Sequence, residues 1–483
     1  MTHPVDALPQ TPPALAALEA QVRRDLASIE VPLRPWVPER RMTSGEILTD
    51  VVIVGAGLSG LAIAFGLMRQ GVSRLQVIDA APMGREGPWV TSARMRTLRS
   101  PKTLSGPDLG VPSLTYRAWH EAMFGTADWD ALDKIDRCTW MDYLVWFRTI
   151  VGITVSNDTR LMAITPADDH IALTLETPEG PAIMACRKVV LATGIEGAGG
   201  LHVPPLIAKS LPRERWTHSG ELLDLDRLTG RSIGVIGAAA SSFDWAVAAL
   251  DAGAVEVTML ARSPTLPQTE ILDWSNFPGF LNHFADLDDA LRYQFARRMF
   301  AFKTPPTMEM YTRATASPAF RFVGGAALDA AAMDGDSIAL TAGGQTYRFD
   351  HLLLGTGYAV DISQRRELAG LIESIALWSD RFTPPAESVD RDLLAYPYLG
   401  PAFEFTEKAP GTAPFLKDIH IFNNGAVPSL GPVCNGITGL KSGVPKLVSG
   451  VTRGLFLADA ALHYRSLDGY AKVHFDPAAA GLA

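Results

Sequence analysis

The sequence predicts an α/β protein in which one Rossmann-like dinucleotide-binding domain is inserted into another. Two glycine-rich turns carry this prediction, each between an apolar run and a predicted helix: Gly55-Ala56-Gly57-Leu58-Ser59-Gly60 and Gly237-Ala238-Ala239-Ala240-Ser241-Ser242. A strand, a tight turn and a helix form the unit that binds a pyrophosphate at the helix N-terminus. The third observation is a pair of apolar strands with Thr-Gly turns, residues 188–194 and 351–358, which flank the second turn.

The first glycine-rich turn favours FAD or NAD over NADP. Gly55 permits the tight turn, Gly57 lets the backbone approach a pyrophosphate, and Gly60 lets the helix pack closely on the strand. The helix N-terminus, which includes Ser59, faces the phosphates with free N–H groups. Asp79 follows Gly60 by 19 residues, where its carboxylate would accept hydrogen bonds from ribose hydroxyls and repel a 2′-phosphate. A glycine turn without a ligand is the alternative.

The second turn departs from the glycine pattern but keeps small residues. Ala239 and Ser242 stand where the second and third glycines would be, and Ser241 and Ser242 supply hydroxyl donors for a phosphate. The position that matches the ribose acid is Ala261, and Arg262 follows it. Because a guanidinium suits a 2′-phosphate, the sequence predicts NADPH rather than NADH. A solvated cation at the strand end is the alternative interpretation of Arg262.

The composition is that of an ordinary globular enzyme. The 483 residues allow two full cores, with 47% hydrophobic and 20% charged residues. A net charge of −9 argues against a general nucleic-acid surface. Cys138, Cys186 and Cys434 lie far apart, so we expect no metal site and no redox disulfide, and a cytoplasmic location. No run is apolar enough to span a bilayer, and residues 1–4 do not begin a signal peptide.

These motifs divide the chain into four predicted segments. They are an N-terminal arm (1–49), the first part of the FAD-binding domain (50–200), the NADPH-binding domain (201–350) with a helical insert (264–322), and the second part of the FAD-binding domain with the C-terminal segment (351–483). The arm is expected to hold one helix, over residues 13–29, and to pack on the body or on a second copy of the chain. The aromatic insert is interpreted as core or as a cap over the interdomain cleft. Residues 197–200 predict a linker.

The motifs together resemble the class B flavoprotein monooxygenases, which include flavin-containing, N-hydroxylating and Baeyer–Villiger enzymes. The resemblance extends over roughly residues 50–445. It is carried by the first glycine-rich turn, Ala192-Thr193-Gly194, residues 241–244, Gly355-Thr356-Gly357-Tyr358 and Gly87-Pro88-Trp89. It implies that FAD and NADPH are both bound, with Trp89, Thr193, Gly194, Thr356 and Gly357 among the cofactor contacts.

Two further expectations come from this resemblance. Trp216-Thr217-His218-Ser219 supplies the histidine of the Baeyer–Villiger fingerprint, but Pro212, Glu214 and Leu222 replace its other marked residues. His218 is therefore interpreted as a hinge or an NADPH contact, with a surface histidine as the alternative. The loop that contains Asn435 and Gly436 is expected to point a helix N-terminus at the flavin ring, which places Gly436 beside the cofactor, unless it is a plain surface loop.

Four cations within nine residues are the most unusual feature: Arg94, Arg96, Arg99 and Lys102. The stretch is similar to a segment of flavin-containing monooxygenases that ends in Pro-Lys, and Arg99 replaces an asparagine found near the flavin. A fixed guanidinium would stabilise an anionic flavin or hold a substrate carboxylate, so Arg99 and Lys102 are predicted as catalytic. A solvated basic loop is the alternative. The substrate side is expected to be walled by aromatic residues: Tyr116, Trp119, Trp129 and Trp140.

The sequence therefore predicts an NADPH-dependent FAD monooxygenase without a metal. The resemblance implies that NADPH reduces FAD, that O₂ forms a C4a-(hydro)peroxyflavin, and that one oxygen atom passes to a small substrate. The basic segment favours N-oxygenation of an amine or amino acid. Baeyer–Villiger or sulfide oxygenation, an NADPH–flavin reductase that serves a partner, and a nucleotide-sensing protein are the alternatives. The expected partners are the substrate and O₂, not nucleic acid or membrane, and a homo-oligomer stays open.

Overall fold

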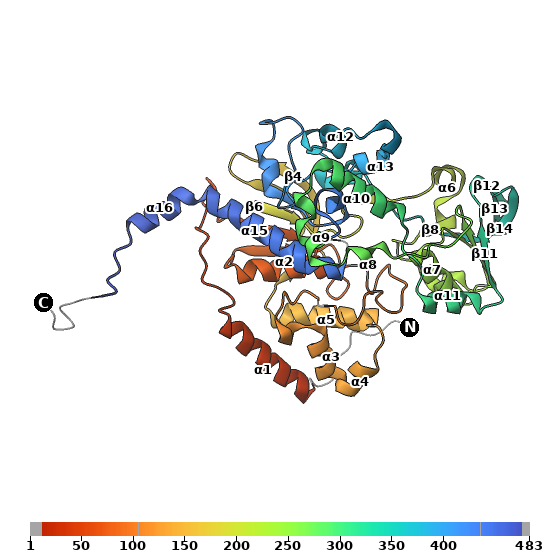
Figure 1. Cartoon of the computed structure of the whole chain (residues 1–483), viewed down its shortest axis with the longest axis horizontal. Helices are drawn as coiled ribbons and strands as arrows, with labels where there is room; N and C mark the ends of the chain where they lie inside the picture. The colour runs from red at the N-terminus through yellow and green to blue at the C-terminus, as the bar shows by residue number, and fades with distance from the viewer. Residues whose placement is uncertain (1–11, 105, 435, 476–483) are drawn as a thin grey trace.

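The computed structural model describes residues 12–104, 106–434 and 436–475. The chain start, where we expected no signal peptide, and Asn435, which we expected in the flavin-side loop, lie outside this part of the chain. Two sheet-based units lie side by side, with the first unit in the middle of the view and the second on the right (Figure 1).

The first unit is built on a sheet that has seven strands within the described residues. Its parallel members are β1 (Thr49–Val54), β2 (Leu75–Ile78), β3 (Val155–Ser156), the end of β6 (Gly180–Leu191) and β17 (Ile419–Ile421). β4 (Arg160–Pro166) and β5 (Ile171–Thr177) add an antiparallel ladder to the beginning of β6. Since β17 follows the whole second unit in the chain, the predicted insertion of one unit into the other is confirmed.

Helices cover this sheet and bury its apolar strands. α2 (Leu58–Arg69) begins within the first glycine-rich turn, directly after Gly57, and packs against α15 (Leu440–Ala458). The two helices approach closely at Gly66, where an added Cβ would lie 2.9 Å from the Val448 side chain. The same unit contains α5 (Arg137–Ile150) and α3 (Tyr116–Phe124). α1 (Pro13–Ser28) packs on α3, so the N-terminal helix lies where the sequence predicted it and packs on the body. The same unit also contains α4 (Thr126–Ala131) and α14 (Val427–Leu430).

The second unit is built on a parallel sheet of β8 (Trp216–His218), β9 (Ser232–Ile236), β10 (Glu256–Ala261), β11 (Phe320–Gly324) and β15 (His351–Leu354), in the order β11-β10-β9-β15-β8. α7 (Ala240–Asp251) begins within the second glycine-rich turn, and α11 (Met308–Thr315) packs on α7. A separate antiparallel sheet of β12 (Leu328–Asp334), β13 (Ser337–Ala342) and β14 (Gln345–Phe349) lies beside α6 (Pro205–Ser210). The predicted two-unit α/β fold is thereby confirmed.

The two connections between the units pair with each other. β7 (Gly199–Leu201) leads into the second unit and β16 (Tyr358–Val360) leads back, as an antiparallel ribbon. The prediction of a plain glycine linker at residues 197–200 was therefore incomplete. An added Cβ at Gly199 would lie 2.0 Å from the Ala359 carbonyl oxygen, so this glycine permits a close backbone approach.

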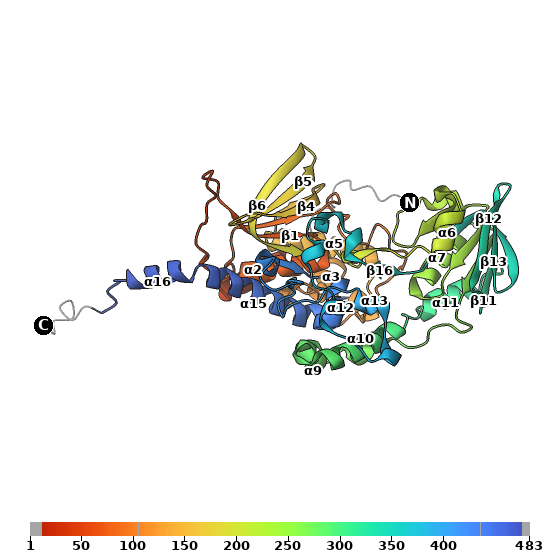
Figure 2. The same ribbon diagram turned by 90° about the horizontal axis from the view of Figure 1, so that it is seen from above.

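The helical insert of the second unit reaches back over the first. α8 (Ile271–Ser275) leads to α9 (Pro278–His283), which packs on α15, and to α10 (Asp289–Ala301), which packs on α14 (Figure 2). Three aromatic residues of the insert are buried: Phe280 and Phe284, which pack with Val427 of the first unit, and Tyr293. Trp274 is 52% exposed. The segment before β17 holds short helices, including α12 (Trp378–Arg381) and α13 (Arg391–Leu394). α16 (Ala460–Asp468) extends away from the body (Figure 1).

Candidate functional site

The first glycine-rich turn has the backbone geometry that a pyrophosphate needs. Gly55 has φ +104°, and a Cβ there would lie 2.4 Å from the Ala192 carbonyl oxygen. A Cβ at Gly60 would lie 1.8 Å from the Gly55 carbonyl oxygen, so only glycine allows α2 to begin so close to β1. No side chain caps α2, whose first N–H groups therefore lack a side-chain acceptor. Ser59 lies half-buried in the same first turn. These residues fit the pyrophosphate of FAD.

Asp79 lies directly after β2, at the carboxyl edge of the sheet. Its Oδ2 accepts a hydrogen bond from the Ala56 N–H at 2.6 Å, and its Oδ1 accepts one from Ala81 at 2.7 Å. Burial raises the pKa of Asp79, and the two backbone donors oppose that rise. A cavity of about 370 Å³ opens beside this position and is lined by residues that include Ile78 and Asn157. Asp79 does not line this cavity, and its ribose contact stays a prediction.

Glu86 is a buried acid that the sequence interpretation missed. Arg148 donates to its Oε1 at 2.5 Å, and Asn157 donates to the same atom at 2.7 Å. Its Oε2 is buried without a hydrogen-bond partner among the described residues. The signal was its position, immediately before the Gly87-Pro88-Trp89 segment.

Trp89 places an unpartnered donor beside the first turn. An added Cβ at Gly87 would lie 3.6 Å from the Trp89 Nε1 and 4.0 Å from the Cα of Gly57, so the indole N–H lies close to the turn. This Nε1 is buried without a hydrogen-bond partner in the described chain. The ring packs edge-on against Trp140, with centroids 6.1 Å apart. The predicted cofactor contact of Trp89 fits this placement.

Two other predicted contacts lie at the same edge of the first sheet. Thr193 follows β6, and its Oγ1 accepts a hydrogen bond from the Asn423 side chain at 3.2 Å. Asn423 follows β17 and accepts a bond from the Gly425 N–H at 2.9 Å. Because β1, β6 and β17 are parallel, their carboxyl ends meet here, and Gly194 turns the chain away with φ +71°. Gly436 is exposed before the short helical turn that leads into α15, and its flavin contact stays a prediction.

The second glycine-rich turn has similar backbone geometry, but its Ser242 hydroxyl bonds to the protein backbone. Gly237 has φ +110°, and a Cβ there would lie 2.5 Å from the Gly355 carbonyl oxygen. The buried Ser242 donates to that same oxygen at 3.4 Å, so it secures the neighbouring turn, and its phosphate contact stays a prediction. No side chain caps α7, and Ser241 is half-buried in its first turn. Arg262 is exposed and makes no hydrogen bond or ion pair within the described residues, which leaves it free for a 2′-phosphate.

His218 ties the two connecting segments together. It is fully buried, so the surface alternative was wrong. Its Nε2 donates to the Gly357 carbonyl at 2.9 Å, and its Nδ1 accepts from the Gly220 N–H at 3.0 Å. Burial lowers the pKa of His218, which keeps the ring neutral in this arrangement. Thr356 donates to the His202 carbonyl across the same junction, and these contacts support a hinge role.

The basic segment bridges the two units instead of forming a solvated loop. Arg99 donates to Asp244 of α7 at 2.5 Å, and Arg96 lies 3.5 Å from Glu309 of α11. The Arg94 guanidinium lies over the Trp245 ring, 4.6 Å from its centroid. Sequence reasoning missed Asp244 as the partner of Arg99, although the family-like stretch 241–244 ends on it. Burial raises the pKa of Asp244 to about 6, against the opposing effect of Arg99.

Lys102 lies apart from this bridge. Its ammonium donates to the carbonyl oxygens of Trp129 and Leu132, at 2.7 and 2.6 Å, around the end of α4. Arg99 and Lys102 are thus both held by protein partners, and their catalytic roles stay predictions. The expected aromatic wall was wrong, because its members are at most 3% exposed and pack on one another as core: Tyr116, Trp119, Trp129 and Trp140.

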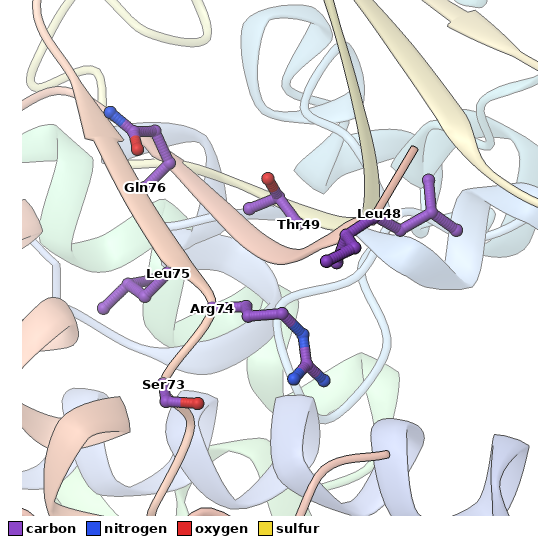
Figure 3. A pocket seen from close by; sticks show the side chains of 7 residues that line it. Leu48, Thr49, Ser73, Arg74, Leu75 and Gln76 are labelled. Carbon is purple, nitrogen blue, oxygen red and sulfur yellow. The ribbon is translucent and has the colours of Figure 1, made fainter. Parts of the chain in front are cut away.

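A second cavity lies at the opposite edge of the first sheet. It measures about 220 Å³ and lies where β1 and β2 begin, between residues that include Thr49 and Gln76 (Figure 3). Arg74 borders it and pairs with the buried Asp50 at 2.9 Å. The glycine-rich turn lies at the other end of these strands, so this cavity is separate from the candidate site.

The described residues contain no group of three or more His, Cys, Asp or Glu side chains arranged to hold a metal ion. All three cysteines are free thiols. None of the helices in the described ranges has both the length and the apolar character needed to cross a membrane.

Two glycine cradles, each at the end of a parallel strand in its own sheet, with a paired ribbon between the two units, define a flavoprotein that binds FAD together with a nicotinamide dinucleotide. A family model described as FAD-NAD(P)-binding matches residues 52–196, and one described as L-lysine 6-monooxygenase/L-ornithine 5-monooxygenase matches residues 130–304. The chain is 39% identical over 462 residues to the FAD-dependent urate hydroxylase of Xanthomonas campestris, with 96% of this chain and 97% of that protein covered. The chain belongs to the family of this flavin-dependent monooxygenase.

Solved structures show the same fold at low sequence identity. The reduced form of the ornithine hydroxylase PvdA from Pseudomonas aeruginosa aligns with a TM-score of 0.66 at 15% identity, over 84% of this chain and 100% of that one. The ornithine N-hydroxylase KtzI from Kutzneria, with reduced FAD, NADP⁺ and L-ornithine, aligns with a TM-score of 0.65 at 18% identity, over 84% and 99%. The predicted class of enzyme, a flavin monooxygenase that uses FAD and NADP(H), is confirmed.

Proposed function

We propose that this monooxygenase hydroxylates urate or a closely similar anionic, nitrogen-rich heterocycle, with NADPH as the electron donor. One observation carries the proposal: the identity to the urate hydroxylase is 39% and runs along 96% of the chain. The ornithine hydroxylases share only 15–18% identity, so they support the fold alone. The cations that line the boundary between the two units favour an anionic substrate over a purely cationic amine.

When bound, FAD and NADPH supply the redox chemistry, in which substrate, O₂, NADPH and a proton give hydroxylated substrate, NADP⁺ and water. One C–O bond forms on the substrate, the O–O bond breaks, and the second oxygen atom leaves as water. The residues of the chain position the two cofactors and set the electrostatic field around them. Gly55, Gly57 and the start of α2 hold one pyrophosphate, and Gly237 with the start of α7 holds the other.

In this proposal, contacts between the two units hold FAD and NADPH at a defined position relative to each other. Arg99 of the first unit and Asp244 of the second lie in contact, and His218 fixes the returning connection at Gly357. Since hydride transfer needs close and oriented reactants, these contacts position the nicotinamide side against the flavin side. Arg262, free at the end of β10, selects NADPH in this proposal.

The experiment is a coupled assay with purified, FAD-loaded protein, NADPH, air and urate. We expect urate loss, NADPH oxidation and O₂ consumption in equal amounts, with little hydrogen peroxide. NADPH oxidation that urate does not accelerate, with peroxide as the product, would overturn the urate proposal. NADH in place of NADPH tests the donor.

A second candidate is N-oxygenation of an amine or amino acid, as the sequence favoured. The family model for lysine and ornithine monooxygenases, which matches residues 130–304, supports it. The same assay with L-ornithine and L-lysine separates the two candidates, because a hydroxylamine product would replace urate loss. The proposal also includes a cytoplasmic location, supported by the three free thiols, and leaves self-association to a measurement of molecular mass.

A further inference from the structure

Two guanidinium groups at the boundary between the units have no acidic partner within the described residues. Arg94 donates to the carbonyl oxygens of Thr91 at 2.6 Å, Ala93 at 3.3 Å and Leu223 at 3.4 Å. Its Nε is buried and makes no hydrogen bond in the described chain. Arg137 donates to the carbonyl oxygen of Trp89. Neither guanidinium forms an ion pair in this part of the protein.

The two cations come from adjoining segments, because the backbone N–H of Arg137 donates to the Arg96 carbonyl oxygen at 3.1 Å, two residues after Arg94. Burial, and after it the Arg137 guanidinium, lowers the pKa of Arg94. Both side chains are half-buried. A partly buried cation beside a like charge is unfavourable unless an anion neutralises it. The protein keeps this arrangement at a place where its own residues do not supply that anion.

Three acids of the adjoining segments and helices have other partners. Asp136 caps α5 by accepting hydrogen bonds from the backbone N–H groups of Cys138 and Thr139, at 2.7 and 3.1 Å. Asp244 pairs with Arg99, and Glu309 lies against Arg96. These three acids therefore do not neutralise the charges of Arg94 and Arg137.

The placement of the pair points to the substrate. Arg94 stacks on Trp245 of α7, and the N-terminus of this helix is the proposed binding position for the pyrophosphate of NADPH. Arg137 contacts Trp89, which adjoins the first turn and carries its own buried, unpartnered N–H. Arg94 thus contacts α7 of the second unit, and Arg137 contacts the segment of the first unit that adjoins the first glycine-rich turn. A substrate must reach this region to meet the flavin, whereas the phosphates of NADPH are expected at the start of α7 and at Arg262.

We propose that Arg94 and Arg137 form an anion-binding site that holds the oxygenated substrate as its anion. The identity of that anion as urate rests on the proposed function; the anion site itself does not. Arginine suits this task because its planar fork of N–H donors binds delocalised oxyanions in two places at once. This site takes over the substrate-holding role that the sequence had given to the neighbouring Arg99.

The test measures the binding of urate to the oxidised, FAD-loaded protein in the absence of NADPH. The shift in the flavin absorbance spectrum reports this binding. Arg94→Met and Arg137→Met remove the charge and keep an apolar chain of similar length. We expect each to raise the Kd for urate by about 10–100-fold, as the loss of one or two charged hydrogen bonds implies. FAD content and the Kd for NADPH should stay within about threefold of wild type.

Two further variants control for folding and for charge. Arg96→Met removes an arginine of the same segment that is paired with Glu309 and exposed, and it should leave the Kd for urate unchanged. Arg94→Lys keeps the charge without the fork, and it should recover part of the lost affinity. If Arg94→Met weakens NADPH and spares urate, or spares both, the site does not hold the substrate and the proposal is overturned.

A second probe separates this proposal from the proposed function. If wild-type protein does not bind urate, that substrate is wrong, and sodium nitrate then tests the site as a small planar anion. Nitrate should perturb the flavin spectrum of wild type and Arg96→Met but not of Arg94→Met. Equal nitrate affinity in all three proteins would overturn the anion site.

Discussion

Arg99 of the first unit and Asp244 of α7 in the second unit form an ion pair with 2.5 Å between Nη2 and Oδ2. The Asp244 side chain is only 8% exposed, while that of Arg99 is 36% exposed. The pair lies between the segment that follows Trp89 and the helix that follows the second glycine-rich turn. It is one of several side-chain contacts that join the two units, together with Arg96–Glu309 and the stacking of Arg94 on Trp245.

A double-mutant cycle measures the coupling between Arg99 and Asp244. We expect Arg99→Ala and Asp244→Ala each to slow reduction of the flavin by NADPH, because the nicotinamide would meet the flavin in fewer productive orientations. The double variant should be little slower than either single variant, with a coupling energy of about 0.5–3 kcal/mol. The measurement is anaerobic stopped-flow bleaching of the flavin. Additive effects would show that the two residues act independently.

The pH dependence of stability follows from the raised pKa of Asp244. Burial raises it from 3.8 to about 6, so between these values the folded protein holds a proton that the unfolded chain has lost. The contribution of Asp244 to stability therefore falls as the pH rises from about 4 to about 6. We expect Asp244→Asn to lack this decrease, so that wild type loses stability relative to the variant over that range. Urea unfolding at several pH values is the measurement, and parallel curves would contradict the assignment.

Selection of NADPH over NADH is assigned to Arg262. Because this side chain is exposed and unpaired within the described residues, its loss removes no internal contact. We expect Arg262→Ala to raise the Kd for NADPH by about 10-fold or more and to leave the Kd for NADH within about twofold. Titrations of both nucleotides against the oxidised protein give the two values. An equal loss for both would place the 2′-phosphate elsewhere.

The sequence predicts the glycine cradles well because their geometry is local. Gly55 and Gly237 both have positive φ and both face a carbonyl oxygen that a side chain would strike, so glycine at these positions identifies the turn without knowledge of the rest of the fold. The strands and helices around them follow from apolar patterning in the same way.

The contacts of the basic segment could not be predicted from the sequence, because they depend on how one unit packs on the other. Arg94, Arg96 and Arg99 meet Trp245, Glu309 and Asp244, which are more than a hundred residues away in the chain. Local sequence gives no indication of these partners. Ser242 shows the same limit, since its hydroxyl bonds to the Gly355 turn of a distant strand.

The first glycine-rich turn offers a direct test of FAD binding. Gly55→Ala would place a Cβ about 2.4 Å from the Ala192 carbonyl oxygen and in a conformation with φ +104°. We expect the variant to be purified with little FAD and to lose at least about 1–3 kcal/mol of stability. Gly370→Ala is the matched control, because nothing lies within 4 Å of its added Cβ and its φ is ordinary. Retention of full FAD content by Gly55→Ala would contradict the assigned cradle.

Substitution of Lys102 tests whether this cation, which the sequence predicted as catalytic, stabilises the fold instead. Its ammonium donates to backbone carbonyls of Trp129, Asp130 and Leu132, and it lies 5.0 Å from the centroid of the Trp129 ring. A cation at the end of a helix satisfies carbonyl groups that have no partner in the helix itself. We expect Lys102→Met to lower the free energy of unfolding by about 1–3 kcal/mol, since several charged hydrogen bonds are lost. Flavin reduction and coupling to substrate, measured below the unfolding transition, should stay within about twofold of wild type. A variant of unchanged stability that loses hydroxylation would instead establish Lys102 as catalytic, since a capping role alone leaves the reaction unaltered.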